Sequence, residues 1–335
     1  MQRIIRLIGT FFLLLLVQAS LAQVARQRMA VLMGARFDIT IVAKDSLTAE
    51  RYIDSVIAEV SRIEYLISDW KPASQVSAVN RNAGIAPVKV DREVLELAER
   101  AIRISELTHG AFDISFAAME RIWKYDGSMT AMPDSAVVRQ AVAKVGYRNI
   151  VIDKEQSTIF LKLPGMKIGF GALGEGYATD RCRDMMLARG IHAGIVNGSG
   201  DMSTWGRQPN GSPWTIGISD PFDRGSLYAV VPLRTSAVTT SGSYEKYVEL
   251  DGKRYSHIIN PTTGYPVTGL TSVTVFGPSA EMANAFSTSI MVMGKEAGFR
   301  LLKQFPAYTT IMVSDEGKFY TSKKIKLRKY RQRDQ

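Results

Sequence analysis

The stretch FGALGEGYATDRCRDMMLARGIHAGIVNGSGD, residues 170–201, carries the local pattern from which the fold class can be derived. Three early glycines open a predicted helix over 171–190, and a predicted short strand over 191–201 ends in small polar residues. Several short strands follow as far as Tyr255 before another helix is predicted. Because strands come in runs with helices between them, we expect an α+β fold rather than a doubly wound parallel sheet.

Hydrophobic periodicity predicts the remaining elements outward from this stretch. A strand is predicted over 31–42, helices over 47–69, 91–108 and 280–294, and hairpins over 148–162 and 313–320, while 76–84 is turn-prone. The chain shows no Pro- or Ser-rich linker and no internal repeat. We therefore expect a single mature domain over 23–321 with mixed and antiparallel sheets and packed helices.

Composition excludes several classes of protein. The chain has 335 residues, of which 46% are hydrophobic and 22% charged, and this excludes intrinsic disorder and collagen-like repeats. The single cysteine, Cys182, excludes an intramolecular disulfide and any multi-cysteine zinc or iron–sulfur site. Only three histidines are present, which argues against a histidine-rich metal centre.

The net charge of +10 is concentrated at the ends of the chain. Residues 322–335 form a basic tail with seven basic residues and one acidic residue. This tail predicts either a solvated chain end or contact with an anionic surface such as the inner membrane. The body shows no nucleic-acid-binding motif, so we expect no nucleic-acid partner.

Residues 1–22 have the pattern of a secretory signal peptide. Two early arginines precede a mostly apolar stretch over 7–17, and the small residues Ser20 and Ala22 precede a predicted cleavage point before Gln23. The apolar stretch is short for a membrane-spanning helix, although an uncleaved anchor is the alternative. We therefore expect export, and a periplasmic or periplasm-facing location in a bacterium.

Three stretches combine glycine with small polar or acidic residues that could carry chemistry. The glycines of 170–180 would let backbone N–H groups approach a phosphate, although a plain turn is the alternative and neither the Walker nor the Rossmann spacing is present. His257 lies in the second stretch, where a hydrogen-bonded core histidine is the alternative. In the third, Asn284 and Thr288 share one helix face and would suit a hard cation, with a helix packing contact as the alternative.

Nine short motifs extend this pattern along the chain. They are MGARF at 33–37, LISDW at 66–70 with Ser74, Ser77 and Asn80, HGAFD at 109–113, GEGYA at 174–178 with Asp180, VNGSGD at 196–201, WTIGI at 214–218, TSGSY at 240–244, YSHIINPTTG at 255–264 and NAFST at 284–288. In this order they resemble the motifs of the ApbE family, the exported FAD:protein FMN transferases of bacteria.

The resemblance implies a single ApbE-like domain, related to the T-fold, that binds FAD and Mg²⁺. Such proteins transfer the FMN moiety of FAD to a Thr or Ser hydroxyl of a target protein and release AMP. The implied acceptor carries a short Ser/Thr flavinylation motif, in a membrane redox-complex subunit or an exported FMN-binding domain.

The resemblance also implies the site residues. Contacts to the flavin and adenine fall on Met33, Trp70, Ala111, Phe112, Asp113, Glu175 and His257, and metal ligands fall on the backbone carbonyl of Ala178 and the side chains of Asn284 and Thr288. His257, Asn284 and Thr288 are the candidates for catalysis. His257 would either hold or polarise a phosphate oxygen or move a proton, and the sequence leaves both roles open.

Two departures from the family pattern bear on activity. Asn284 stands where the metal-binding helix usually carries Asp, so we expect weaker ion binding, and Gly169 stands where many members carry Asp. An FAD pyrophosphatase that releases FMN and AMP, and a non-catalytic FAD-binding protein, are therefore the alternatives to a transferase.

Overall fold

The computed structural model describes residues 23–119, 122–223, 225–233, 236–244, 246–322, 325 and 328–329. Its centre is an eight-stranded sheet whose order is β1 (Val24–Leu32), β2 (Ala35–Ala43), β6 (Ala193–Gly198), β7 (Asp201–Trp205), β10 (Ser236–Gly242), β13 (Leu270–Gly277), β14 (Thr309–Ser314) and β15 (Phe319–Thr321). Every neighbouring pair in this sheet is antiparallel. The expected α+β fold is confirmed.

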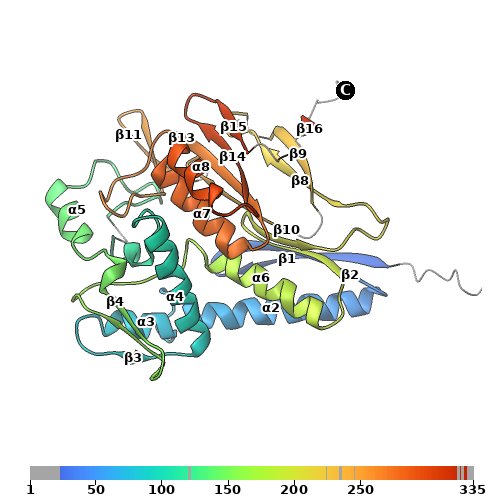
Figure 1. Cartoon of the computed structure of the whole chain (residues 1–335), viewed down its shortest axis with the longest axis horizontal. Coiled ribbons are helices and arrows are strands. Elements are labelled where there is room, and N and C mark those ends of the chain that lie inside the picture. The colour runs from blue at the N-terminus through green and yellow to red at the C-terminus, as the bar shows by residue number, and fades with distance from the viewer. Residues whose placement is uncertain are drawn as a thin grey trace, which may run out of the picture.

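Helices and three smaller sheets surround the central sheet (Figure 1). The α-helices are α2 (Ser46–Ile67), α3 (Gln75–Arg81), α4 (Arg92–Leu107), α5 (Ser135–Val142), α6 (Gly174–Ala188), α7 (Ala280–Met293) and α8 (Lys295–Lys303), and two 3-10 helices span Ile114–Met119 and Tyr147–Asn149. The smaller sheets have the orders β3 (Val88–Lys89), β5 (Thr158–Leu161) and β4 (Ile150–Asp153); β11 (Tyr247–Leu250) and β12 (Lys253–Ser256); and β16 (Arg328–Lys329), β9 (Leu227–Leu233) and β8 (Trp214–Ser219).

The main hydrophobic core lies between the first strands of the central sheet and helix α2. Strand β2 alternates, so that Phe37, Ile39 and Ile41 all point into this core and are fully buried. Helix α2 meets them with the apolar stripe that begins at Ile53 and Val56. A separate cluster around Trp214 and Val231 packs the β8–β9 sheet against the central sheet.

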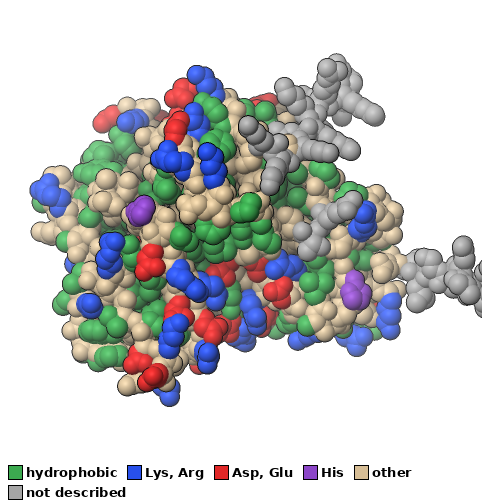
Figure 2. All heavy atoms as spheres, in the orientation of Figure 1, with side chains coloured by type: hydrophobic (Ala, Val, Ile, Leu, Met, Phe, Trp, Pro, Cys, Tyr) green, Lys and Arg blue, Asp and Glu red, His purple; other side chains and the backbone are tan. Residues whose placement is uncertain are grey.

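Ion pairs also connect the helices. Figure 2 shows basic and acidic side chains interspersed over the face that carries α4 and α6. Arg62 of α2 contacts Glu93 of α4 at 2.7 Å. Arg100 of α4 contacts Glu281 of α7 at 2.7 Å, with Glu281 almost buried. The second pair fixes α4 against the first turn of α7, the helix that carries Asn284.

Helices α6 and α7 approach each other closely because of Gly176. A Cβ at this position would lie 2.6 Å from the carbonyl oxygen of Ala280, at the start of α7. Asp180, one turn further along α6, accepts hydrogen bonds from Ser203 of β7 and from Ser279, the N-cap of α7, both at 2.7 Å. These contacts set the position of α7 relative to α6 and β7.

Two predicted elements are wrong. The strand predicted over 31–42 is a hairpin, because Met33 and Gly34 both adopt positive φ, 53° and 74°, and form a two-residue turn between β1 and β2. The segment 76–84 was predicted as turn-prone, but its residues 76–81 belong to helix α3. The N-cap of this helix, Ser74, accepts a hydrogen bond from the Ser77 N–H. Helices α5 and α8 were not predicted.

The helices predicted over 47–69, 91–108 and 280–294 and the hairpins over 148–162 and 313–320 are present. At the C-terminal end, Ile325 packs on the Trp214 cluster and β16 pairs with β9. These contacts lie beyond residue 321, the predicted end of the domain.

The predicted signal peptide, residues 1–22, lies outside the described residues, as does most of the basic tail. Within the described part of the chain, none of the helices has the length and apolar character needed to cross a membrane.

Candidate active site

A cleft of about 830 Å³ collects most of the predicted site residues. Its lining includes Trp70, Ala111, Phe112, Asp113, Glu175, His257, Asn284 and Thr288. An adjoining lobe of about 430 Å³ shares Trp70 and Glu175 with this cleft and is lined in addition by Met33. Volumes of this size are typical of sites for cofactors and other small molecules.

His257 is oriented by the backbone of Lys246. The ring Nδ1 lies 3.0 Å from the Lys246 carbonyl oxygen. A carbonyl only accepts hydrogen bonds, so Nδ1 carries the proton and Nε2 keeps a lone pair. Tyr125 packs edge-on against the ring at 6.4 Å. Burial lowers the pKa of His257 below its usual value, which favours the neutral imidazole near pH 7.

Asn284 and Thr288 lie one turn apart on α7 and face the cleft together. The Thr288 hydroxyl donates to Asn284 Oδ1 at 3.4 Å, and it lies 3.3 Å from the hydroxyl of Ser241 on β10. Three neutral oxygen atoms therefore gather on one wall of the cleft. Oxygen ligands of this kind suit Mg²⁺ or Ca²⁺ rather than a soft metal ion.

Two acidic residues lie beside this wall. Asp201, at the start of β7, accepts a hydrogen bond from Asn284 Nδ2. Burial raises the pKa of Asp201 well above its usual value, and the nearby Glu175 raises it further. Burial also raises the pKa of Glu175 to about 7. Desolvated carboxyl groups with raised pKa values mark a place where a cation is favoured.

Asp201 did not stand out in the sequence as a site residue. It was visible there only as the last residue of the VNGSGD motif, with no role of its own. Its position beside Asn284 depends on the pairing of β7 in the central sheet.

Asp113 is held by its own loop. Its Oδ1 accepts hydrogen bonds from the Ser115 N–H at 2.8 Å and from the Ser115 hydroxyl at 2.6 Å, and its Oδ2 accepts one from the Tyr147 N–H at 2.8 Å. Burial raises the pKa of Asp113, and these hydrogen bonds act in the opposite direction. Asp113 therefore fixes the loop that presents Ala111 and Phe112 to the cleft.

Trp70 is 70% exposed although it lines both lobes of the site. An exposed indole at the rim of a cleft offers a flat apolar surface that a bound aromatic ring can cover. Met33, in the turn between β1 and β2, approaches the N-terminus of α6 near Gly174. The apolar side chains of the second lobe thus lie beside the glycine-rich helix start.

Ala178 is not placed as the sequence predicted. It is fully buried in α6 and does not line the cleft, and a carbonyl inside a helix is paired with the N–H four residues later. Ala172 does line the cleft and lies one residue before the N-cap Leu173, so its carbonyl precedes the hydrogen bonds of the helix. Ala172 is the better candidate for a carbonyl ligand.

Another acidic residue occupies the space beside Gly169, the position where many family members carry Asp. A Cβ at Gly169 would lie 2.9 Å from Asp69 Oδ2, so the carboxylate of Asp69 occupies the space beside this glycine. Asp69 also lines both lobes of the site. A carboxylate is therefore present at this point of the cleft although position 169 has no side chain.

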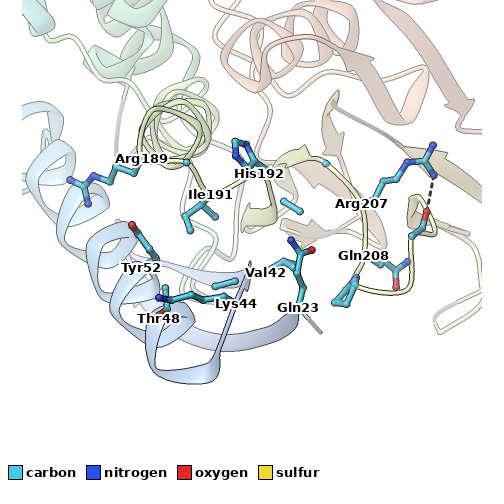
Figure 3. Close-up of a pocket in the computed structure, with 16 residues that line it drawn as sticks. Gln23, Val42, Lys44, Thr48, Tyr52, Arg189, Ile191, His192, Arg207 and Gln208 are labelled. Carbon is cyan, nitrogen blue, oxygen red and sulfur yellow. Dashed lines mark hydrogen bonds between the residues drawn. The ribbon is translucent and has the colours of Figure 1, made fainter. Parts of the chain in front are cut away.

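The described residues contain no cluster of three or more His, Cys, Asp or Glu side chains arranged as a metal site. A second cleft, of about 880 Å³, is surrounded by Lys44, Arg189, His192 and Arg207 (Figure 3). None of its described lining residues is an acid, and none is a predicted site residue. The oxygen and carboxylate groups needed for a hard cation gather only in the first of these two clefts.

Comparisons with known proteins agree with the composition of this cleft. A family model described as the ApbE family matches residues 33–312. A curated FAD:protein FMN transferase of Klebsiella pneumoniae is 31% identical over 291 residues, covering 85% of this chain and 83% of the relative. One of Treponema pallidum is 31% identical over 276 residues, covering 78% and 76%.

Solved structures show the same likeness along nearly the whole chain. The ApbE protein of Thermotoga maritima superposes with a TM-score of 0.82 and 29% identity, covering 90% of this chain and 97% of its own. The flavin transferase ApbE of Vibrio cholerae superposes with a TM-score of 0.79 and 27% identity, covering 90% and 98%.

Proposed function

The chain belongs to the ApbE family, and on that premise we propose that it is an FAD:protein FMN transferase. The enzyme transfers the FMN moiety of FAD to a hydroxyl group of a protein. The observation that carries the proposal is the 830 Å³ cleft, where His257, Asn284 and Thr288 meet the apolar and acidic residues that the family resemblance assigns to FAD.

The cleft and its adjoining lobe offer FAD both apolar surface for its rings and backbone groups for its phosphates. Phe112 and Trp70 present apolar surface for a ring system. The start of α6, which begins at Gly174, lines the same cleft through Glu175, and backbone N–H groups at a helix start favour phosphate oxygens. We therefore place the pyrophosphate near Glu175 and Asn284 and the rings in the lobes.

We propose that Mg²⁺ assists the reaction, because the donor atoms present fit a hard cation. Asn284 Oδ1, Thr288 Oγ1 and the carbonyl of Ala172, in place of Ala178, would hold the ion, and the raised pKa values of Glu175 and Asp201 indicate that positive charge is favoured here. Mg²⁺ usually takes few protein ligands and completes its shell with water and phosphate. When bound it neutralises charge on the pyrophosphate oxygens.

We assign the proton transfer to His257. The acceptor hydroxyl attacks the FMN phosphorus, a new P–O bond forms, and the bond from that phosphorus to the bridging oxygen breaks, so that AMP leaves. The hydroxyl proton passes to Nε2, because Nδ1 already donates a hydrogen bond to the Lys246 carbonyl and burial favours the neutral imidazole. Of the two roles left open by the sequence, the oriented neutral ring favours that of a base.

The acceptor and the location are parts of the proposal. We propose a Ser or Thr hydroxyl in an exported FMN-binding domain or a membrane redox-complex subunit as the acceptor. The signal-peptide pattern of residues 1–22 supports export to the periplasm, and the basic character of 322–335 supports contact with the membrane surface.

One assay tests the function. The purified protein is incubated with FAD, Mg²⁺ and an exported FMN-acceptor domain, and the products are read as flavin fluorescence on a denaturing gel and as AMP. A fluorescent acceptor band that EDTA abolishes, with AMP released in equal amount, is the expected result. An acceptor with its Ser/Thr changed to Ala is the matched control and should stay dark.

The same assay separates the alternatives. AMP and free FMN without a labelled acceptor would identify an FAD pyrophosphatase. Bound FAD with neither AMP nor a labelled acceptor, tested over several acceptor domains, would identify a non-catalytic FAD-binding protein.

A further inference from the structure

We infer that Asp201 is a positioning residue for the cation site and supplies the negative charge that Asn284 lacks. The inference rests on the proposed function, because it concerns the ion that assists FMN transfer. Asp201 is at the start of β7 and Asn284 is on α7, so the two residues come from different elements. Their side chains are 5% and 6% exposed, which removes both from bulk water.

The hydrogen bond between them determines which way the amide of Asn284 points. Asn284 Nδ2 donates to Asp201 Oδ2, and Asn284 Oδ1 accepts from the Thr288 hydroxyl at 3.4 Å. Because Asp201 Oδ2 accepts this hydrogen bond, the NH₂ group of the amide faces Asp201. Oδ1 is therefore turned toward Thr288, where it can serve as a ligand.

The surroundings of Asp201, as far as the structure describes them, offer neutral and acidic groups. Thr239 and Asn284 are its side-chain hydrogen-bond partners, and the nearby charged groups are the acids Glu175 and Asp180. Among the described residues, Asp201 forms no ion pair with a lysine or arginine. A buried carboxylate without a cationic partner is costly, and a divalent cation held by the adjacent Asn284 would remove that cost.

Asp180 is a buried carboxylate in the same region whose role is structural, and it serves as a comparison for Asp201. It is also buried, but it pairs with Arg183 at 2.9 Å and accepts hydrogen bonds from Ser203, Ser279 and the Glu281 N–H. Its charge is balanced and its function is to join α6, β7 and α7. Asp201 has no such set of partners and faces the cleft.

A single aspartate at position 284 would supply both a ligand oxygen and a negative charge. In this protein the two functions are divided between Asn284 and Asp201. Asn284 offers a neutral ligand oxygen, and Asp201 offers the charge and the orientation. Exchanging the two side chains should preserve the heavy-atom geometry, because an Asn at 201 can donate to an Asp at 284. The exchange therefore tests the inference without changing the number of charges.

The test uses the full-length protein with FAD bound and Mn²⁺ as the probe, without acceptor. Free Mn²⁺ is measured by electron paramagnetic resonance, and FAD binding is measured separately by flavin fluorescence. The variants are Asp201→Asn, the exchange Asp201→Asn with Asn284→Asp, and Asp184→Asn as a matched control. Asp184 is on the outer side of α6 and pairs with Arg183, so its loss should leave Mn²⁺ affinity unchanged.

We expect Asp201→Asn to weaken Mn²⁺ binding by about tenfold and the exchange to restore the affinity to within about threefold of the parent protein or better. Mn²⁺ affinity unchanged in Asp201→Asn, or not restored in a folded exchange variant that binds FAD, would overturn the inference. If Asp201→Asn alone does not fold, the exchange variant carries the test by itself. A parent protein that fails to bind FAD would instead contradict the proposed function.

Discussion

Replacing Gly176 by alanine should separate the two helices that form the cation site. A Cβ at Gly176 would lie 2.6 Å from the Ala280 carbonyl oxygen and 2.9 Å from the Glu281 N. Both are backbone atoms in the first turn of α7 and cannot rotate away. To reach an ordinary contact of 3.4 Å, α6 and α7 must move apart by roughly 0.8 Å.

The expected loss of stability is modest. Forcing a methyl group into a packed contact costs about 1–3 kcal/mol, and the higher helix propensity of alanine returns up to about 1 kcal/mol. We expect a net decrease of about 1–2 kcal/mol in the free energy of unfolding.

The expected loss of activity is larger. The shift moves Asn284 and Thr288 away from Ala172 and Glu175, and a displacement near 1 Å in a catalytic site can cost about 10²-fold in rate. We therefore expect FMN transfer to fall far more than stability.

Urea unfolding and the initial rate of acceptor labelling measure the two effects. Gly171→Ala is the control for stability, because a Cβ at Gly171 meets no atom within 4 Å. Unchanged unfolding of Gly176→Ala together with a transfer rate within about twofold of the parent would refute the packing argument.

Three further predictions concern the cleft. His257→Gln should reduce the transfer rate by about 10²–10⁴-fold. In the parent protein the rate should fall toward acid pH, because burial lowers the pKa of His257 and protonation of the ring removes the base. A pH–rate profile of parent and variant measures both effects, and an acid-side fall that persists unchanged in His257→Gln would contradict the role as base. Glu175→Gln should stabilise the metal-free protein by about 1–3 kcal/mol at pH 8 and hardly at all near pH 5. Burial raises the pKa of Glu175 to about 7, so the ionised carboxylate destabilises the folded protein only at higher pH. Urea unfolding at both pH values measures this difference, and an equal effect at both would be evidence against the buried, raised-pKa carboxyl. Thr288→Ala should abolish Mg²⁺-dependent transfer whereas Thr288→Ser should keep most of it, since the hydroxyl is the proposed ligand. Titration of the transfer rate with Mg²⁺ compares the two variants, and full activity in Thr288→Ala would rule out Thr288 as a ligand.

Local signals in the sequence predicted the four longest helices, α2, α4, α6 and α7, and two of the hairpins, β4–β5 and β14–β15. The stripe of apolar residues predicted α2, whose bounds differ from the prediction by two residues or fewer. The β1–β2 hairpin was missed because the turn at Met33 and Gly34 interrupts a run of alternating residues that also fits a single strand. Alternation fixes which face a residue occupies but does not show where the chain reverses.

The candidate site was predicted from motifs, and the structure brings most of the predicted residues to one cleft. His257, Asn284, Thr288 and Glu175 line one cleft although they come from separate parts of the chain. The carbonyl ligand at Ala178 stays a prediction, and the motif by itself does not show that Ala178 lies inside the hydrogen-bond ladder of α6 whereas Ala172 precedes it.

The sequence by itself determined the α+β class, the family and the identity of many of the residues at the cleft, because these depend on local periodicity and on motifs in a fixed order. Only the tertiary structure decided where the acids lie. Asp69 fills the space beside Gly169, and Asp201 faces Asn284 across 83 residues of chain. The physical reason is that strand pairing and helix packing bring carboxylates from distant parts of the chain next to Gly169 and Asn284, which carry no carboxylate themselves.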